Sequence, residues 1–147
     1  QILAALEVAV ENGLNVPLVF NSGGYDRRAT LKLLDGVFDI YMPDFKFWDS
    51  QVAESSCQAA DYPETARRAL AEMHRQVGDL QIDDAGIGRR GLLIRHLVLP
   101  GGLAGTREVM RFVAQKNISL QLRQRHVSIQ TLRPGARSRG TRITPFT

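Results

Sequence analysis

Cysteine is almost absent from this chain of 147 residues, which contains Cys57 alone. A single cysteine excludes an internal disulfide and is typical of a reducing compartment, so we expect a cytoplasmic protein. It also excludes any iron–sulfur or zinc site that takes several thiolates from this chain. The sequence equally lacks an apolar run of the roughly 20 residues that span a bilayer, and it shows no signal peptide. We therefore expect no membrane partner.

Acidic residues are missing from one region of the sequence. Residues 121–147 carry six arginines and neither Asp nor Glu. The remaining 13 basic residues are outnumbered by 15 acidic ones, so the net charge of +4 becomes −2 for residues 1–120. Residues 1–120, which we call the body of the chain, have no basic stripe and so do not favour nucleic-acid binding. The chain's hydrophobic content of 44% is enough for one domain with a core.

Strand and helix patterns alternate through this body. Short apolar runs between turn residues predict strands, and apolar residues at helical spacing predict helices. The expected strands are residues 16–20, 37–42 and 91–99, and the expected helices are residues 1–11, 27–34, 61–77 and a segment beginning at Thr106, with connections at 49–60 and 80–90. Such alternation predicts right-handed βαβ units on a parallel sheet. Because Gln1 falls inside a helix pattern, we expect a fragment with further strands before it.

Polar residues gather where the expected strands end. The carboxyl ends of parallel strands meet at one edge of the sheet, and active sites form there. Asn21 and Ser22 follow the first strand, while Asp44 and Lys46 follow the second and lie on the same side of an extended chain. An ordinary ion pair at a rim, and turn residues, are the alternatives. His96 lies within the third strand, where a hydrogen-bonded core histidine is the commoner role.

Several segments around these positions resemble one known family, the radical S-adenosylmethionine proteins related to pyruvate formate-lyase activating enzymes. The segments that carry the resemblance are residues 16–25, 34–46, 61–64, 72–78 and 90–100. The resemblance runs continuously from Gln1 to about Ser119, with the matching blocks in the family's order. It implies an α/β fold, a partial (β/α)6 radical SAM barrel of which residues 1–119 form the middle and later β/α units.

The resemblance also implies a chemistry. In this family a 4Fe-4S cluster, reduced by an external electron donor, cleaves S-adenosylmethionine to a 5′-deoxyadenosyl radical. The radical abstracts hydrogen from a protein of the glycyl-radical type or from a small molecule. A Cys-x3-Cys-x2-Cys loop holds the cluster, and a Gly-Gly-Glu segment helps to hold the cofactor; this sequence contains neither. The resemblance thus implies a fragment of a radical SAM enzyme, inactive as given, that binds neither group well by itself.

The family's functional residues can be carried over by position. Asp44 and Lys46 match an Asp-Leu-Lys element whose Lys contacts S-adenosylmethionine, with Phe45 in place of Leu. Asn21 and Ser22 match an Asp-Thr pair that surrounds a monovalent cation together with a Met and the Asp of that element, and Asn21 removes a negative charge from the set. The resemblance implies a cofactor side formed by Asn21, Ser22, Asp44, Lys46 and His96, and a monovalent cation site formed by Asn21, Ser22, Met42 and Asp44.

Two other functions stay open at this point. Lys46 has the amine that a Schiff-base aldolase or lyase barrel would use as its nucleophile. A half-barrel without its first strands could also persist only as a non-catalytic interaction product, with a hydrophobic edge exposed.

The resemblance ends abruptly after Ser119. The family continues with a strand close to Tyr-Val-Asn-Val-Met-x-Gln-Tyr-Arg-Pro, which residues 120–147 lack. Reading from the second base of the Gln121 codon, the degenerate codons permit that motif. We therefore expect residues 120–147 to be an out-of-frame tail. The alternative is a basic disordered tail that binds RNA.

Overall fold

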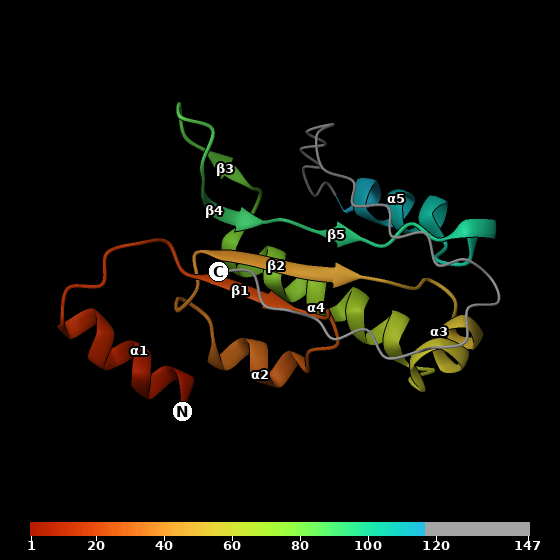
Figure 1. The fold of residues 1–147 in the computed structure, drawn as a ribbon, viewed down its shortest axis with the longest axis horizontal. Helices are drawn as coiled ribbons and strands as arrows, with labels where there is room; N and C mark the ends of the chain where they lie inside the picture. The colour runs from red at the N-terminus through yellow and green to blue at the C-terminus, as the bar shows by residue number, and fades with distance from the viewer. Residues whose placement is uncertain (117–147) are drawn as a thin grey trace, which may run out of the picture.

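Residues 1–116, which the computed structural model describes, form a five-stranded sheet with α2 and α4 packed on one face (Figure 1). The elements in chain order are α1 (Ile2–Glu11), β1 (Val19–Ser22), α2 (Arg28–Leu33), β2 (Ile40–Phe45), α3 (Ser50–Cys57), α4 (Tyr62–Val77), β3 (Gln81–Ile82), β4 (Gly88–Leu92), β5 (Arg95–His96), the 3-10 turn η1 (Pro100–Gly102) and α5 (Thr106–Gln115). The expected tail, residues 120–147, lies outside the described part of the chain. None of the described helices is long and apolar enough to cross a bilayer.

Strand β2 is the centre of the sheet. It pairs in parallel with β1 on one side, and on the other side with β4 along its first half and with β5 along its second half. Strand β3 adds to the outer edge of β4 in the antiparallel direction. The parallel pairing places Asn21 beside Met42 and places Asp44 beside Arg95. The carboxyl ends of β1, β2 and β5 therefore lie next to one another.

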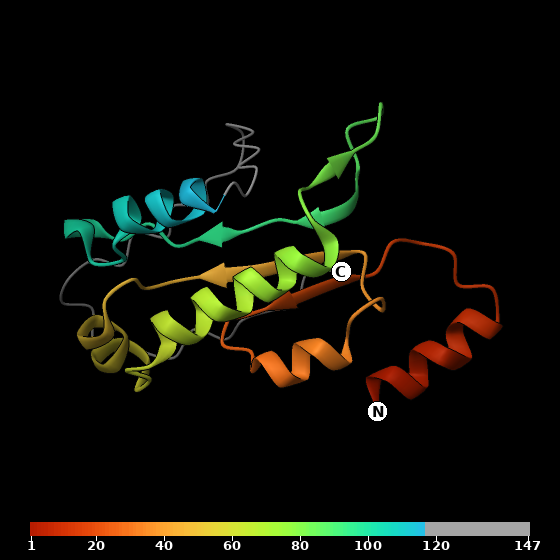
Figure 2. The same ribbon diagram turned by 180° about the vertical axis from the view of Figure 1, so that it is seen from behind.

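The hydrophobic core lies between this sheet and the helices behind it. Alternate residues of β2, namely Tyr41, Pro43 and Phe45, are fully buried, as expected for a strand with one face covered. They face α4, which runs across the back of the sheet with α2 beside it (Figure 2). Met42 and Asp44 point the other way and are only partly buried. In Figure 1 this second face of β1 and β2 is toward the viewer, and no described helix crosses it.

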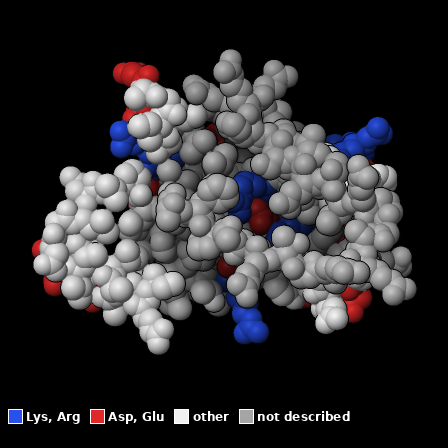
Figure 3. Space-filling model, viewed as in Figure 1, with Lys and Arg blue, Asp and Glu red and all other residues white. Residues whose placement is uncertain are grey.

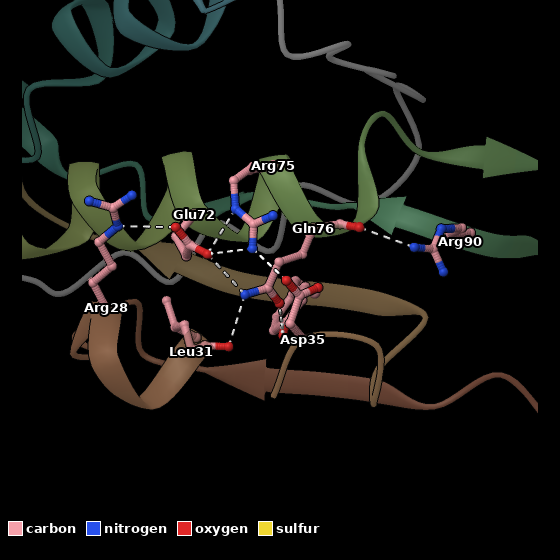
Figure 4. Close-up of polar contacts among 8 residues, drawn as sticks. Arg28, Leu31, Asp35, Glu72, Arg75, Gln76 and Arg90 are labelled. Carbon is pink, nitrogen blue, oxygen red and sulfur yellow. Dashed lines mark hydrogen bonds and ion pairs between the residues drawn. The ribbon is translucent and has the colours of Figure 1, made fainter. Parts of the chain in front are cut away.

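A buried acidic residue ties α2 to α4 at the back of the sheet (Figure 4). Glu72 on α4 is 2% exposed and accepts hydrogen bonds from Arg28 on α2 and from Arg75 and Gln76 on its own helix. The amide of Gln76 also donates to the Leu31 carbonyl at 2.8 Å. Several partners therefore stabilise the charge of Glu72, as a buried carboxylate requires.

The expectation of a partial (β/α)6 barrel is wrong. The five strands form an open, mixed sheet that is mostly parallel and does not close. The expected third strand, residues 91–99, is divided into β4 and β5, with Leu93 and Ile94 between them. Strand β3, in a segment expected to be a loop, pairs antiparallel with β4 and occupies the edge that a further parallel strand would need.

Most of the other expected elements are confirmed with shifted ends. The four expected helices correspond to α1, α2, α4 and α5, whereas α3 falls in a segment expected to be a connection. Strand β1 begins at Val19 rather than Val16, because Pro17 has no N–H and the N–H of Leu18 donates to the Asp39 carboxylate. The candidate polar residues still lie at the carboxyl ends of β1 and β2.

Candidate functional site

Four polar side chains meet at the carboxyl edge of the sheet: Asn21, Asp44, Lys46 and Arg95, which we call the edge cluster. Arg95 donates from Nε to Asp44 Oδ1 and from Nη2 to Asn21 Oδ1, both at 2.9 Å. The ammonium Nζ of Lys46 lies 3.5 Å from Asp44 Oδ2. The parallel register of β1, β2 and β5 thus brings together residues more than 70 positions apart.

The edge cluster is accessible and carries a net positive charge. The exposed side-chain fraction is 24% for Asp44, 41% for Lys46 and 47% for Arg95. Two cations around one carboxylate leave a net charge of +1, and Arg95 Nη1 has no partner among residues 1–116. Basic and acidic side chains lie side by side near the middle of this face in Figure 3. The cluster can therefore accept an anionic group at its cations while Asp44 and Asn21 offer oxygen acceptors.

Ser22 belongs to the turn that follows β1 and does not join the edge cluster. Its hydroxyl donates to Asp26 Oδ2 at 2.6 Å and accepts the N–H of Gly24 at 3.2 Å. Gly24 has φ +76°, and a Cβ on it would lie 2.1 Å from the carbonyl oxygen of Asp44. Gly24 is thus explained by the close approach of this turn to β2, with no phosphate required.

The oxygens of the expected monovalent cation site are already paired. Asn21 Oδ1 and Asp44 Oδ1 both accept from the Arg95 guanidinium, and the Ser22 hydroxyl is turned to Asp26. In this arrangement the Arg95 guanidinium, rather than a metal cation, supplies the positive charge between Asn21 Oδ1 and Asp44 Oδ1. No group of three or more His, Cys, Asp or Glu residues suited to a metal ion occurs among residues 1–116. The cation site remains a prediction.

His96 links β2, β5 and α5. Its Nδ1 lies 2.5 Å from the Phe45 carbonyl oxygen and its Nε2 lies 2.9 Å from Thr106 Oγ1. A carbonyl only accepts, so Nδ1 carries the hydrogen and the neutral Nε2 accepts from the Thr106 hydroxyl. Burial lowers the pKa of His96, although the bond to the Phe45 carbonyl opposes this shift. Both ring nitrogens are used within the chain, and a cofactor contact by His96 remains a prediction.

The same face of the sheet is apolar at the opposite end of the strands. A cavity of about 360 Å³ lies there, lined by Val19, Ile40, Met42, Leu80, Ile82, Gly86, Gly88 and Leu93. Met42 and Asp44 point to the same face two residues apart on β2, so the apolar cavity and the edge cluster are neighbours. This face, which no helix of residues 1–116 crosses, therefore combines an apolar wall with a charged rim, a combination common in small-molecule sites.

Two residues of this region do not follow from the sequence patterns. Arg95 connects Asn21 to Asp44, and Tyr62 at the start of α4 contacts the backbone of Asp44 and Lys46. Position gives a signal for Arg95, because it directly precedes His96 on the strand that pairs with the end of β2. For Tyr62 the sequence holds no comparable signal, since its contacts depend on where α4 meets the sheet.

Comparison with known proteins gives little direct information on activity. No protein-family model matches the chain, and no solved structure matches it. An uncharacterized protein of Methanocaldococcus jannaschii is 29% identical over 102 residues. That alignment covers 69% of this chain and 26% of the relative, so the chain spans about a quarter of the length of the curated relative it matches. The chain is thus similar to one part of a longer archaeal protein, and its function has to be argued from the site.

Proposed function

We propose that this chain is part of a radical S-adenosylmethionine protein related to pyruvate formate-lyase activating enzymes, and that its edge cluster holds S-adenosylmethionine. One observation carries the proposal: Asp44 lies between Arg95 and Lys46, beside Asn21, at the carboxyl edge of adjacent parallel strands. Ligands of open parallel sheets bind at this edge. The resemblance of residues 16–25 and 34–46 to the family gives the ligand its identity.

The chemical groups of S-adenosylmethionine suit the residues of the edge cluster. Its carboxylate can accept hydrogen bonds from Lys46 and Arg95, whose side chains are partly exposed. Arg95 uses one lone pair on each of Asp44 Oδ1 and Asn21 Oδ1, so the amino group and ribose hydroxyls can donate to the second lone pair of these oxygens. In this proposal the chain's own residues bind and orient the cofactor at the rim of the sheet.

The iron–sulfur cluster does not fit this chain. A cluster of this type takes several thiolates, and the sequence has Cys57 alone. Cys57 lies at the end of α3, where its thiol donates to the Ala53 carbonyl. We propose that a different part of a longer protein supplies the cluster, and no step of the reaction is assigned to this chain. A cytoplasmic location, an external electron donor and a protein or small-molecule substrate follow from the proposal as further expectations.

Replacing Lys46 by methionine is expected to weaken binding of S-adenosylmethionine. The wild-type chain offers one wall of a site, so we expect a Kd on the order of 1 mM, within reach of ligand-observed NMR titration. K46M keeps the length and apolar stem of the side chain and removes the charge, and we expect Kd to rise about fivefold or more. The matched control is K32M, an exposed lysine on α2 at the back of the sheet.

Several results would count against this function. Equal affinity of wild type and K46M for S-adenosylmethionine, or an equally large loss of affinity in K32M, would show that the cofactor does not bind at the edge cluster. Borohydride trapping of a carbonyl compound on Lys46 would instead favour the aldolase or lyase alternative. If the wild-type chain binds no S-adenosylmethionine at concentrations well above 1 mM, the alternative of a non-catalytic interaction product is favoured.

A further inference from the structure

The hydroxyl of Tyr62 joins three backbone groups beneath the edge cluster. It accepts the N–H of Lys46 at 2.9 Å and lies 3.0 Å from the Gly23 carbonyl and 3.1 Å from the Asp44 carbonyl. Its single hydrogen is shared between those two carbonyls. One side chain of α4 therefore connects the turn after β1 to the end of β2.

These contacts cross between segments that carry different members of the edge cluster. Gly23 lies two residues after Asn21, whereas Asp44 and Lys46 belong to the end of β2. Beyond Ser22 the ladder between β1 and β2 stops, because Ser22 is the last paired residue of β1. The Tyr62 hydroxyl continues the connection past the point where the ladder ends.

The ring of Tyr62 is held firmly in place. Tyr62 is 4% exposed at the first position of α4, and its ring lies 6.0 Å from the ring of Phe47 and 5.8 Å from that of Tyr25. Burial raises the pKa of Tyr62 to about 12, so the hydroxyl keeps its hydrogen throughout the physiological range. The hydroxyl thus stays able to donate and to accept at the same time.

We propose that Tyr62 is the positioning residue of the edge cluster. Through Gly23, Asp44 and Lys46 it sets how the end of β2 faces the end of β1, and so how far Lys46 and Asp44 lie from Asn21 and Arg95. Its effect on cofactor binding rests on the proposed function, whereas its effect on the geometry of the edge cluster does not.

Y62F is the direct test, because it removes the hydroxyl and keeps the ring. The matched control is Y41F, in the core on β2. Tyr41 is fully buried, and its hydroxyl donates to Gln76 Oε1 at 2.6 Å, away from the edge cluster. Both variants lose one buried hydroxyl, so a general loss of stability should be similar in the two. A difference between Y62F and Y41F at the edge cluster is therefore due to the place of the Tyr62 hydroxyl and not to the loss of a buried hydroxyl as such.

Three readouts separate the possible outcomes. In Y62F, but not in Y41F, we expect the Lys46 amide to exchange about tenfold faster with solvent, the Nε–H resonance of Arg95 to shift, and the Kd for S-adenosylmethionine to rise about threefold or more. Unchanged exchange at Lys46, or an unshifted Arg95 resonance, would overturn the proposal. Faster exchange and a shifted Arg95 resonance with unchanged affinity would support the positioning role and would count against S-adenosylmethionine binding at the edge cluster. If the wild-type chain binds no S-adenosylmethionine, the proposed function fails, and the first two readouts still decide the role of Tyr62.

Discussion

Replacing Gly24 by alanine is expected to lower the free energy of unfolding by about 3 kcal/mol, measured by urea denaturation. The backbone of Gly24 has φ +76°, a conformation that costs alanine about 1 kcal/mol or more. The added Cβ would also lie 2.1 Å from the Asp44 carbonyl oxygen and 3.5 Å from the Tyr62 hydroxyl. Backbone cannot move aside as a flexible side chain can, so the turn after β1 must separate from β2.

The matched control is G36A. Gly36 has φ +81°, and nothing lies within 4 Å of the position of its Cβ. Only the backbone strain remains there, and we expect a loss of about 1 kcal/mol. Equal losses in G24A and G36A would mean that the close approach of the turn to Asp44 contributes nothing to stability.

Replacing Glu72 by glutamine is expected to cost about 2 kcal/mol of unfolding free energy at neutral pH. The hydrogen bonds from Arg75 lower the pKa of Glu72 to about 2; the bonds from Arg28 and Gln76 act in the same direction, and burial opposes them. Because the pKa is lower in the folded protein than in the unfolded chain, the stabilisation is fully present above about pH 4.5 and is lost as the pH falls toward 2. The two proteins should therefore become equally stable at the acidic end.

Urea denaturation of wild type and E72Q between pH 7 and pH 2.5 measures this convergence. The control is E64Q on the same helix, which removes an exposed pair with Arg68 and should change the unfolding free energy by less than about 0.5 kcal/mol. A constant difference between wild type and E72Q across this pH range would show that the charge of Glu72 is not what joins α2 to α4.

The sequence predicts the parts of this fold that depend on local pattern. Alternation of apolar runs and amphipathic helices is enough to predict that β1, β2, β4 and β5 run parallel. It also places Asn21, Asp44 and Lys46 at one edge, since parallel strands end on the same side. The barrel prediction fails because a sheet can close only if its edge strands are free to pair with further parallel strands. Here β3 pairs antiparallel with the outer edge of β4, although its sequence is a polar, glycine-rich segment that predicts a loop.

Side-chain partners are harder to predict than elements, as Asp61 illustrates. It directly precedes α4 and lies three residues before Glu64, which is the spacing of a capping box. Its carboxylate makes no capping bond, however, and instead accepts from the hydroxyls of Tyr25 and Thr65. The competing donor, Tyr25, is 36 residues away, so only the folded chain brings it near. The contacts of Tyr62 cannot be predicted from the sequence for the same reason.

The proposed function can be tested most directly in a longer protein, expressed with any residues that the gene encodes in frame before Gln1. Under the proposal, we expect the rest of this longer protein to contain a Cys-x3-Cys-x2-Cys loop, which the chain itself lacks. After anaerobic reconstitution with iron and sulfide, this longer protein should show cluster absorbance and, with dithionite, release 5′-deoxyadenosine from S-adenosylmethionine. The chain of 147 residues alone should do neither. A longer protein without cluster or product, or a brown cluster-bearing protein from this chain alone, would contradict the account.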